Sequence, residues 1–258
     1  MKKIFTLPPS LEGFFMEIAE ITRFSGHFFR SVLRPPYEFI EVIRQSFLIG
    51  YKSLSLVSVT GFIMGLVLTI QSRPTLARFG AESWLPGMVA ISIIREIGPV
   101  ITALICAGKV GSGIGAELAS MKVTEQIDAM EVSGTNPFKY LVVTRVLAAM
   151  LMLPILVIFA DGIGLFGSYI GVNIMGDVTL RLYLTQAIGH LDFVDVFPAL
   201  IKTFFFGFAI GIISCYKGYT SNKGTEGVGI AANSAVVICS LCVFIIDLIA
   251  VQLSSFFM

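Results

Sequence analysis

Residues 92–118, SIIREIGPVITALICAGKVGSGIGAEL, form an apolar run that is long enough to cross a bilayer. About 20 mostly apolar residues in a helix span the roughly 30 Å of hydrocarbon. The run nevertheless carries Arg95 and Glu96 near its start, followed after one residue by Gly98 and the helix breaker Pro99. Charged side chains inside a membrane are costly and mark a functional site by default. The stretch therefore predicts a transmembrane helix with a polar site in it.

The composition of the 258-residue chain is that of a membrane protein. Hydrophobic residues make up 55% of it, charged residues 14%, and the mean hydropathy is +0.87, whereas soluble domains carry about 25% charged residues. The net charge of +1 gives no indication of a nucleic-acid partner. Cys239 and Cys242 have the spacing of a redox pair, but both lie in a bilayer-length apolar segment. We interpret them as small apolar residues and expect no metal and no cofactor.

Five long apolar segments predict an all-α integral membrane protein with a single domain over residues 1–258. The expected spans lie near residues 53–77, 87–117, 138–174, 195–217 and 227–256. Residues 10–34 precede them, with apolar and charged positions on opposite sides of a helix and proline pairs before and after. This pattern predicts an amphipathic helix that lies in the membrane interface.

The positions of lysine and arginine predict the orientation of the spans. One side receives most of them, namely Lys2, Lys3, Arg23, Arg30, Arg34, Arg44, Lys122, Lys139, Lys217 and Lys223. The other side receives only Arg73, Arg78 and Arg181. Because basic residues favour the cytoplasmic side, we expect a cytoplasmic N-terminus and a C-terminus on the opposite, periplasmic side.

Four charged residues from three spans are expected at a similar depth in the outer half of the membrane. They are Arg95, Glu96, Lys202 and Asp247. Adjacent residues on a helix point about 100° apart, so Arg95 and Glu96 need partners on other spans, and Lys202 and Asp247 are the candidates. Asp161 lies deeper, with no evident partner. The cluster is interpreted either as a cavity that binds substrate or as an ion-pair network that fixes helix packing.

Pro99 is expected to kink the second span beside these charges. It has no N–H and crowds the carbonyl four residues back, that of Arg95. A free backbone acceptor is tolerated in a membrane only where it faces protein or a wet cavity.

The glycine-rich stretch AGKVGSGIGA, residues 107–116, does not match a nucleotide-binding loop. A Walker A motif needs glycine where Ala103 stands and serine or threonine where Val110 stands. Small residues recur every four positions instead, which favours close packing of helices. The same spacing occurs in Gly61/Gly65, Gly167/Gly171 and Gly207/Gly211.

The loop ASMKVTEQIDAMEVSGTNP, residues 119–137, predicts a short helix near residues 121–134 on the cytoplasmic side. Thr124 is expected to cap its start and Gly134 to end it. Glu125, Asp128 and Glu131 form an acidic flank. The helix is interpreted either as a docking element for a cytoplasmic partner or as an ordinary surface helix with a solvated face.

Residues 95–148, with the elements Arg-Glu-Ile-Gly-Pro and Glu-Gln-Ile-Asp-Ala, resemble the signature region of the MlaE-type permease family. These permeases are the membrane subunits of ABC systems that move lipids between bacterial membranes. The resemblance extends over nearly the whole chain. It implies a permease without catalysis of its own, in the bacterial inner membrane, that forms a homodimer. It also implies a cytoplasmic ATPase dimer, a periplasmic Mce-domain hexamer and, in several systems, a STAS-domain protein.

The resemblance also implies roles for individual residues. Glu125, Asp128, Glu131 and Gly134 would belong to the coupling helix that seats in the ATPase. Phospholipid head groups would meet Arg95, Glu96, Lys202 and Asp247. Acyl chains would contact Leu68, Leu76 and Phe79 on the first span.

The expected function is ATP-driven transfer of phospholipid between the inner membrane and the periplasmic Mce-domain protein. The same ABC framework with a sterol or another lipid as cargo is an alternative. A stand-alone ion-coupled carrier that uses the charged cluster as a relay is another. The capped acidic loop helix favours the ABC framework, whereas inverted internal repeats, which would favour a carrier, are not seen in the sequence.

Overall fold

The computed structural model describes residues 9–35, 37–174, 176, 178–189, 191–221 and 224–254. The expected end of the fifth span at 255–256, as well as Lys2, Lys3, Pro8, Pro36 and Lys223, lies outside the described residues. The described part contains helices and turns and no strand. This confirms the all-α fold.

Within the described ranges, five long helices are apolar enough to cross a membrane, as expected. The first is α2, Phe39–Arg78. The second runs over Glu82–Val123 and consists of η1, Glu82–Trp84; α3, Leu85–Ser92; η2, Ile93–Ile97; α4, Gly98–Cys106; η3, Ala107–Gly111; and α5, Ser112–Val123. The third joins η4, Phe138–Val143, to α7, Thr144–Asn173. The last two are α9, Phe193–Tyr219, and α10, Thr225–Ser254. Helix α2 begins at Phe39, well before residue 53, where the apolar run in the sequence starts.

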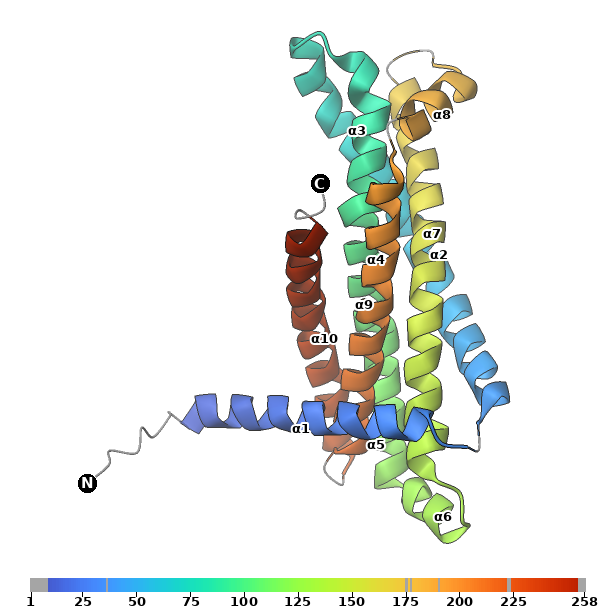
Figure 1. The fold of residues 1–258 in the computed structure, drawn as a ribbon, viewed down its shortest axis with the longest axis vertical. Helices are drawn as coiled ribbons and strands as arrows, with labels where there is room; N and C mark the ends of the chain where they lie inside the picture. The colour runs from blue at the N-terminus through green and yellow to red at the C-terminus, as the bar shows by residue number, and fades with distance from the viewer. Residues whose placement is uncertain are drawn as a thin grey trace, which may run out of the picture.

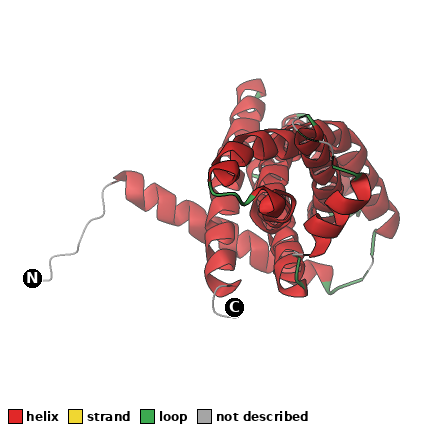
Figure 2. Cartoon of the chain, turned by 90° about the horizontal axis from the view of Figure 1, so that it is seen from above, coloured by secondary structure: helices red, strands yellow, loops and turns green. Residues whose placement is uncertain are grey.

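Three shorter helices of the described chain lie outside the spans. Helix α1, Pro9–Val32, crosses the long helices near one end of the bundle, and α6, Gln126–Val132, projects beyond that same end (Figure 1). We call this the α6 end. Helix α8, Leu180–Gly189, lies at the opposite end, which we call the α8 end. Seen along the bundle, α1 extends sideways from it (Figure 2).

Helices α7 and α9 supply much of the buried core, and α2 and α10 flank them with largely exposed apolar faces. The exposed residues on these faces include Ile40, Ile43, Val237 and Leu248. Such faces are stable only against lipid or another protein surface. The fold is therefore that of a multi-pass membrane protein.

Glycines let α2 and α7 approach each other closely, as the small-residue spacing predicted. A Cβ atom on Gly65 would lie 1.8 Å from the carbonyl oxygen of Gly164, and one on Gly167 would lie 2.2 Å from that of Phe62. Only a residue without a side chain fits at such contacts. The two helices can therefore pack backbone against backbone, a contact typical of membrane helices.

Helix α1 is fixed to the bundle by polar and aromatic contacts. Tyr216 donates a hydrogen bond to Glu20, Lys217 pairs with Glu17, and the ring of Phe24 packs edge-on against Phe138 at 5.0 Å. Exposed apolar side chains of α1 include Phe15, Met16, Ile18 and Phe29. A helix that lies across the bundle with apolar side chains exposed fits the expected position in the membrane interface.

Candidate functional site

Lys202 on α9 lies at the centre of the charged cluster. Its Nζ donates to Glu96 Oε2 at 2.8 Å and to Asp247 Oδ1 at 2.9 Å. The two carboxylates come from η2 and α10, so the lysine joins three segments that are far apart in the sequence. Its side chain is only 5% exposed. The expected contacts among these three residues are confirmed, and they lie in the half of the bundle nearer the α8 end.

Arg95 belongs to the same site but has a partner that the sequence reasoning missed. Its guanidinium lies 3.6 Å from Asp195 Oδ1, in the first turn of α9. The other carboxylate oxygen of Asp195 accepts from the backbone N–H of Asp192 at 3.2 Å. The pair Asp192-x-x-Asp195 is a capping-box pattern, and this signal could have revealed Asp195. With Asp195 included, the cluster holds two cations and three carboxylates.

Arg95 and Glu96 of the second span lie in a π-helical turn, η2. The N–H of Gly98 donates to the carbonyl of Ile93, five residues back, directly before Pro99. The expected disturbance at Pro99 thus takes the form of a widened turn that keeps the helix continuous. Single π turns of this kind occur often at functional sites.

Asp161 on α7 lies against this turn. A Cβ atom on Gly98 would lie 1.8 Å from its Oδ1. That oxygen is buried and has no hydrogen-bond partner among the described residues. Lys202 is within electrostatic range of Asp161. The glycine therefore makes room for a carboxylate beside the charged cluster.

The cleft at the cluster is small in a single chain. Its volume is about 20 Å³, and its polar lining consists of Arg95, Glu96, Asp195, Lys202 and Ser254. This is room for about one water molecule. A larger molecule would meet the outer edge of the cluster, where the side chains of Arg95 and Glu96 are 30% and 36% exposed.

The residues expected to contact acyl chains occupy two environments. Leu68 and Leu76 are partly buried and pack against the small core that contains Leu85 and Val89. Phe79 follows the end of α2 and is 81% exposed. Of the three, Phe79 is the one with most of its side chain open to an outside molecule.

Helix α6 forms the expected short helix, but its start differs from the prediction. Thr124 donates its hydroxyl to Ser120 O at 2.9 Å and ends α5, so the expectation that it caps α6 is wrong. The N-cap is Glu125, which adopts the left-handed conformation with φ 58°. The reason is that α5 continues to Val123, and the chain must turn sharply before α6 can begin.

The end of α6 follows the expectation. Gly134 has φ +80° and donates to Glu131 O at 3.0 Å, and Thr135 N–H donates to Met130 O at 3.0 Å. These two bonds form a Schellman motif, which needs a residue such as glycine at that position.

The surface of α6 has one face toward the bundle and one face away. Ile127 is buried, and Asp128 pairs with Lys122 at 2.9 Å. Glu131 is exposed, and Val132 is 91% exposed. An exposed apolar residue beside acidic ones is typical of a surface that another protein covers.

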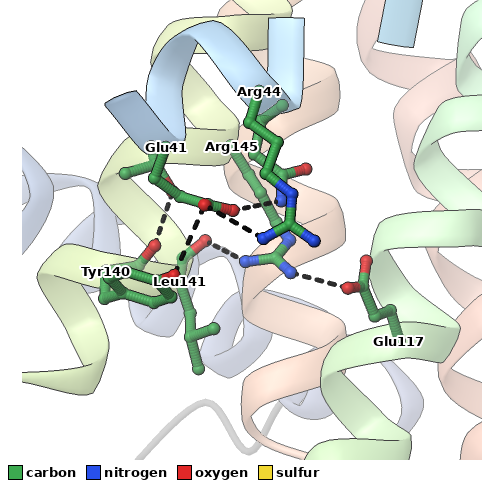
Figure 3. Close-up of polar contacts among 8 residues, drawn as sticks. Glu41, Arg44, Glu117, Tyr140, Leu141 and Arg145 are labelled. Atoms are coloured by element: carbon green, nitrogen blue, oxygen red, sulfur yellow. Dashed lines mark hydrogen bonds and ion pairs between the residues drawn. The ribbon is translucent and has the colours of Figure 1, made fainter. Parts of the chain in front are cut away.

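A second polar network lies in the half nearer the α6 end and was also missed. Figure 3 shows that the carboxylate of Glu41 on α2 accepts a hydrogen bond from the hydroxyl of Tyr140, with the guanidinium groups of Arg44 and Arg145 close by. Arg145 donates to Leu141 O at 3.0 Å and to Glu117 at 2.9 Å. The signal was a charged residue inside the apolar third span, which the sequence reasoning passed over.

Comparison with known proteins identifies a matching family and several relatives of this chain. The family described as "Permease MlaE" matches residues 42–253. A "Probable ABC transporter permease protein" of Rickettsia felis is 42% identical over 240 residues, which cover 93% of each chain. One of the same description from Synechocystis is 34% identical over 236 residues, 92% of this chain and 90% of that one. The Arabidopsis thaliana protein "TRIGALACTOSYLDIACYLGLYCEROL 1, chloroplastic" is 36% identical over 208 residues, 81% of this chain and 59% of that one.

Proposed function

The chain belongs to the MlaE permease family and is an ABC transporter permease, a membrane subunit that works with a partner ATPase, and from this premise we propose that its cargo is phospholipid. It passes phospholipid between the inner membrane and a periplasmic Mce-domain protein. The observation that carries the proposal is the contact of Lys202 with Glu96 and Asp247, flanked by Arg95 and Asp195.

The chemistry of the cluster suits a zwitterionic head group. Charges within a membrane are costly and are retained where they serve a function. Lys202 is neutralised by two carboxylates, whereas Arg95 and Glu96 are partly exposed at the edge. A guanidinium binds a phosphate well, and a carboxylate beside it binds the ammonium of an ethanolamine head group. The edge therefore offers one group for each charge of the lipid.

The size of the cleft requires a second surface to enclose the lipid. A cleft of about 20 Å³ does not hold a head group. We assign the missing wall to a second copy of the chain, because α10 carries a broad exposed apolar face next to Asp247. In the homodimer the cavity lies between the two protomers, beneath the Mce-domain hexamer.

Energy for transport comes from the ATPase through α6. Its exposed Val132 and Glu131, together with Glu125 and Asp128, form the docking surface, and Gly134 fixes its end. This assignment places the α6 end and the N-terminus in the cytoplasm and the α8 end at the periplasm. A STAS-domain protein would bind to the ATPase.

A glycolipid is the second candidate cargo. One relative carries trigalactosyldiacylglycerol in its name, although that protein is considerably longer than this chain. Sugar hydroxyl groups would hydrogen-bond to the same carboxylates. A stand-alone ion carrier fits the family less well, because such a carrier has no need of a docking helix.

Mass spectrometry of the lipids that co-purify with the intact complex tests the proposal. The expected result is phospholipid bound in fixed proportion to the permease, and depleted when Arg95→Gln and Glu96→Gln are combined. Arg44→Gln, which removes a cation near the other end of the bundle, serves as the control. A complex that retains a sterol or a glycolipid instead, or one whose phospholipid content is unchanged by the double variant, would overturn it.

A further inference from the structure

A second polar cavity lies in the opposite half of the bundle. It has a volume of about 340 Å³ between α2 and the η3–α5 segment. Its polar lining includes Lys52, Ser53, Lys109 and Glu117. The volume is within the range of pockets that hold small molecules. It is far larger than the cleft at Lys202.

The lysines of this cavity mark the boundary of the hydrocarbon. On α2, residues 53–72 carry no charge between Lys52 and Arg73, and about 20 residues of helix span the roughly 30 Å of hydrocarbon. Lys52 therefore lies at the boundary toward the α6 end. The ammonium of Lys109 donates to the backbone carbonyl of Lys52, so it lies at the same level. Both cations are at the depth of lipid head groups.

The charge of the two lysines is not neutralised by any carboxylate in the described part of the chain. Neither forms an ion pair with a carboxylate among the described residues. Glu117 lines the cavity too, but it is bonded to the buried Arg145 at 2.9 Å (Figure 3). The excess positive charge at this level therefore favours an anion from outside the chain.

A buried hydroxyl points to the same kind of ligand. Ser53 lines the cavity and is fully buried, and its Oγ has no hydrogen-bond partner among the described residues. An unsatisfied buried hydroxyl is costly, and a phosphate oxygen in the cavity would satisfy it once the Ser53 side chain turns toward the cavity. Leu48, Ile49, Val110 and Ile114 line the same cavity. They offer an apolar surface for the first carbons of acyl chains.

We propose that this cavity binds the phosphate of a phospholipid in the leaflet at the α6 end. The chain then holds head groups in both leaflets, through the charged cluster in one and through Lys52 and Lys109 in the other. The inference rests on phospholipid as the proposed cargo, but it does not need the charged cluster to be a binding site. A lipid held here enters or leaves the transporter through the leaflet that faces the ATPase.

Photo-crosslinking tests the proposal on the complex of permease and ATPase. The complex is reconstituted in vesicles of phosphatidylethanolamine and phosphatidylglycerol, with a trace of phosphatidylglycerol that carries a diazirine close to the phosphate. The expected labelled peptides cover residues 45–53 and 109–117. Lys52→Gln combined with Lys109→Gln should lower this labelling by at least roughly tenfold, since each cation near an anionic lipid contributes about fivefold.

Two variants and one competitor serve as controls for the labelling. Lys52→Arg with Lys109→Arg should restore most of the labelling, and Arg44→Gln, which removes a cation outside the cavity, should leave it unchanged. Each complex is first shown to contain its ATPase in normal amount. Excess inorganic phosphate should not displace the label, because the lipid is held by its acyl chains as well.

Several outcomes would overturn the proposal. They are absence of label in the two peptides, label that the glutamine variants leave unchanged, displacement by inorganic phosphate, and cross-links from these peptides to a second permease chain in place of lipid. Labelling of residues 95–99 and 193–202 is measured in the same experiment. Absence of label in residues 95–99 and 193–202 would contradict the role of the charged cluster, but it would not contradict lipid binding in the second cavity.

Discussion

The carboxylate of Asp161 rests directly on Gly98, so close that a Cβ atom at position 98 would lie 1.8 Å from Oδ1. This contact places a fourth carboxylate, after Glu96, Asp195 and Asp247, beside the π turn that carries Arg95 and Glu96. It also explains why glycine stands before Pro99, where its conformational freedom is not needed. The role of Gly98 is to leave space.

Gly98→Ala should therefore destabilise the protein by about 1–3 kcal/mol, the usual cost of overpacking. The added methyl group meets Asp161 and the carbonyl of Ile93. Gly162→Ala is the matched control, because a Cβ there meets nothing within 4 Å. Thermal unfolding in detergent measures the difference. Equal stability of the two variants would contradict the contact, and Gly98→Ala with Asp161→Ala should recover part of the loss.

Replacement of Lys202 alone should destabilise the protein much more than replacement of Lys202 together with its partners Glu96 and Asp247. Lys202→Met leaves two carboxylates uncompensated, which costs about 3–5 kcal/mol for a buried ion pair. Glu96→Gln, Lys202→Met and Asp247→Asn together should restore most of the stability. If the cluster serves lipid binding, the triple variant folds but retains less phospholipid. If its phospholipid content and transport are normal, the cluster is a structural network.

Helix α6 gives a prediction on docking. Val132→Asp and Glu131→Lys change exposed side chains, so the permease should stay folded while the ATPase is lost on co-purification. Asp128→Lys is a less clean test, because it also opposes Lys122 within the chain. A Val132→Asp complex with normal ATPase content and normal hydrolysis would remove α6 from the coupling surface.

Gly134→Ala tests the end of the same helix. An alanine at φ +80° is strained, with an expected cost of about 1–2 kcal/mol, which should loosen the Schellman motif. We expect weaker ATPase binding and faster proteolysis near residue 134 when the complex is treated with protease. Gly229→Ala, where a Cβ meets nothing within 4 Å, is the control. An unchanged cleavage pattern would contradict this prediction.

The orientation is testable by cysteine labelling. After replacement of the native cysteines, Val132→Cys should react only with a reagent on the cytoplasmic side and Ile188→Cys only with one on the periplasmic side. Both side chains are exposed and lie at opposite ends of the bundle. Reaction of both from the same side would mean that the expected number of membrane crossings is wrong.

Depth along the spans was the part of the site that could be predicted. The length and direction of each apolar run place Lys202 and Asp247 at the level of Glu96, and their contacts are confirmed. Asp195 was missed because it stands at the start of α9, where a charge looks like part of the loop. The cap of α6 was predicted wrongly because the length of α5 depends on its packing against α9 and α10, which a local motif does not reveal.

Arg145 shows a second limit of such reasoning. A charge in an apolar span is visible in the sequence, but its partner Glu117 lies on another helix, in a stretch dominated by glycine and other small residues. The π turn η2 could not be predicted from propensity, because nothing local distinguishes it from an α-helix with a proline.

The widened turn η2 has a geometric consequence for Arg95 and Glu96. A π turn holds one residue more than an α turn, and one residue of an α-helix corresponds to a rotation of about 100° about the axis. When such a turn migrates by one position along the helix, the residue it passes swings around the axis by about that angle. Helices α3 and α4 keep their places on either side. A small local step in the backbone is thus converted into a large change in where a charge points.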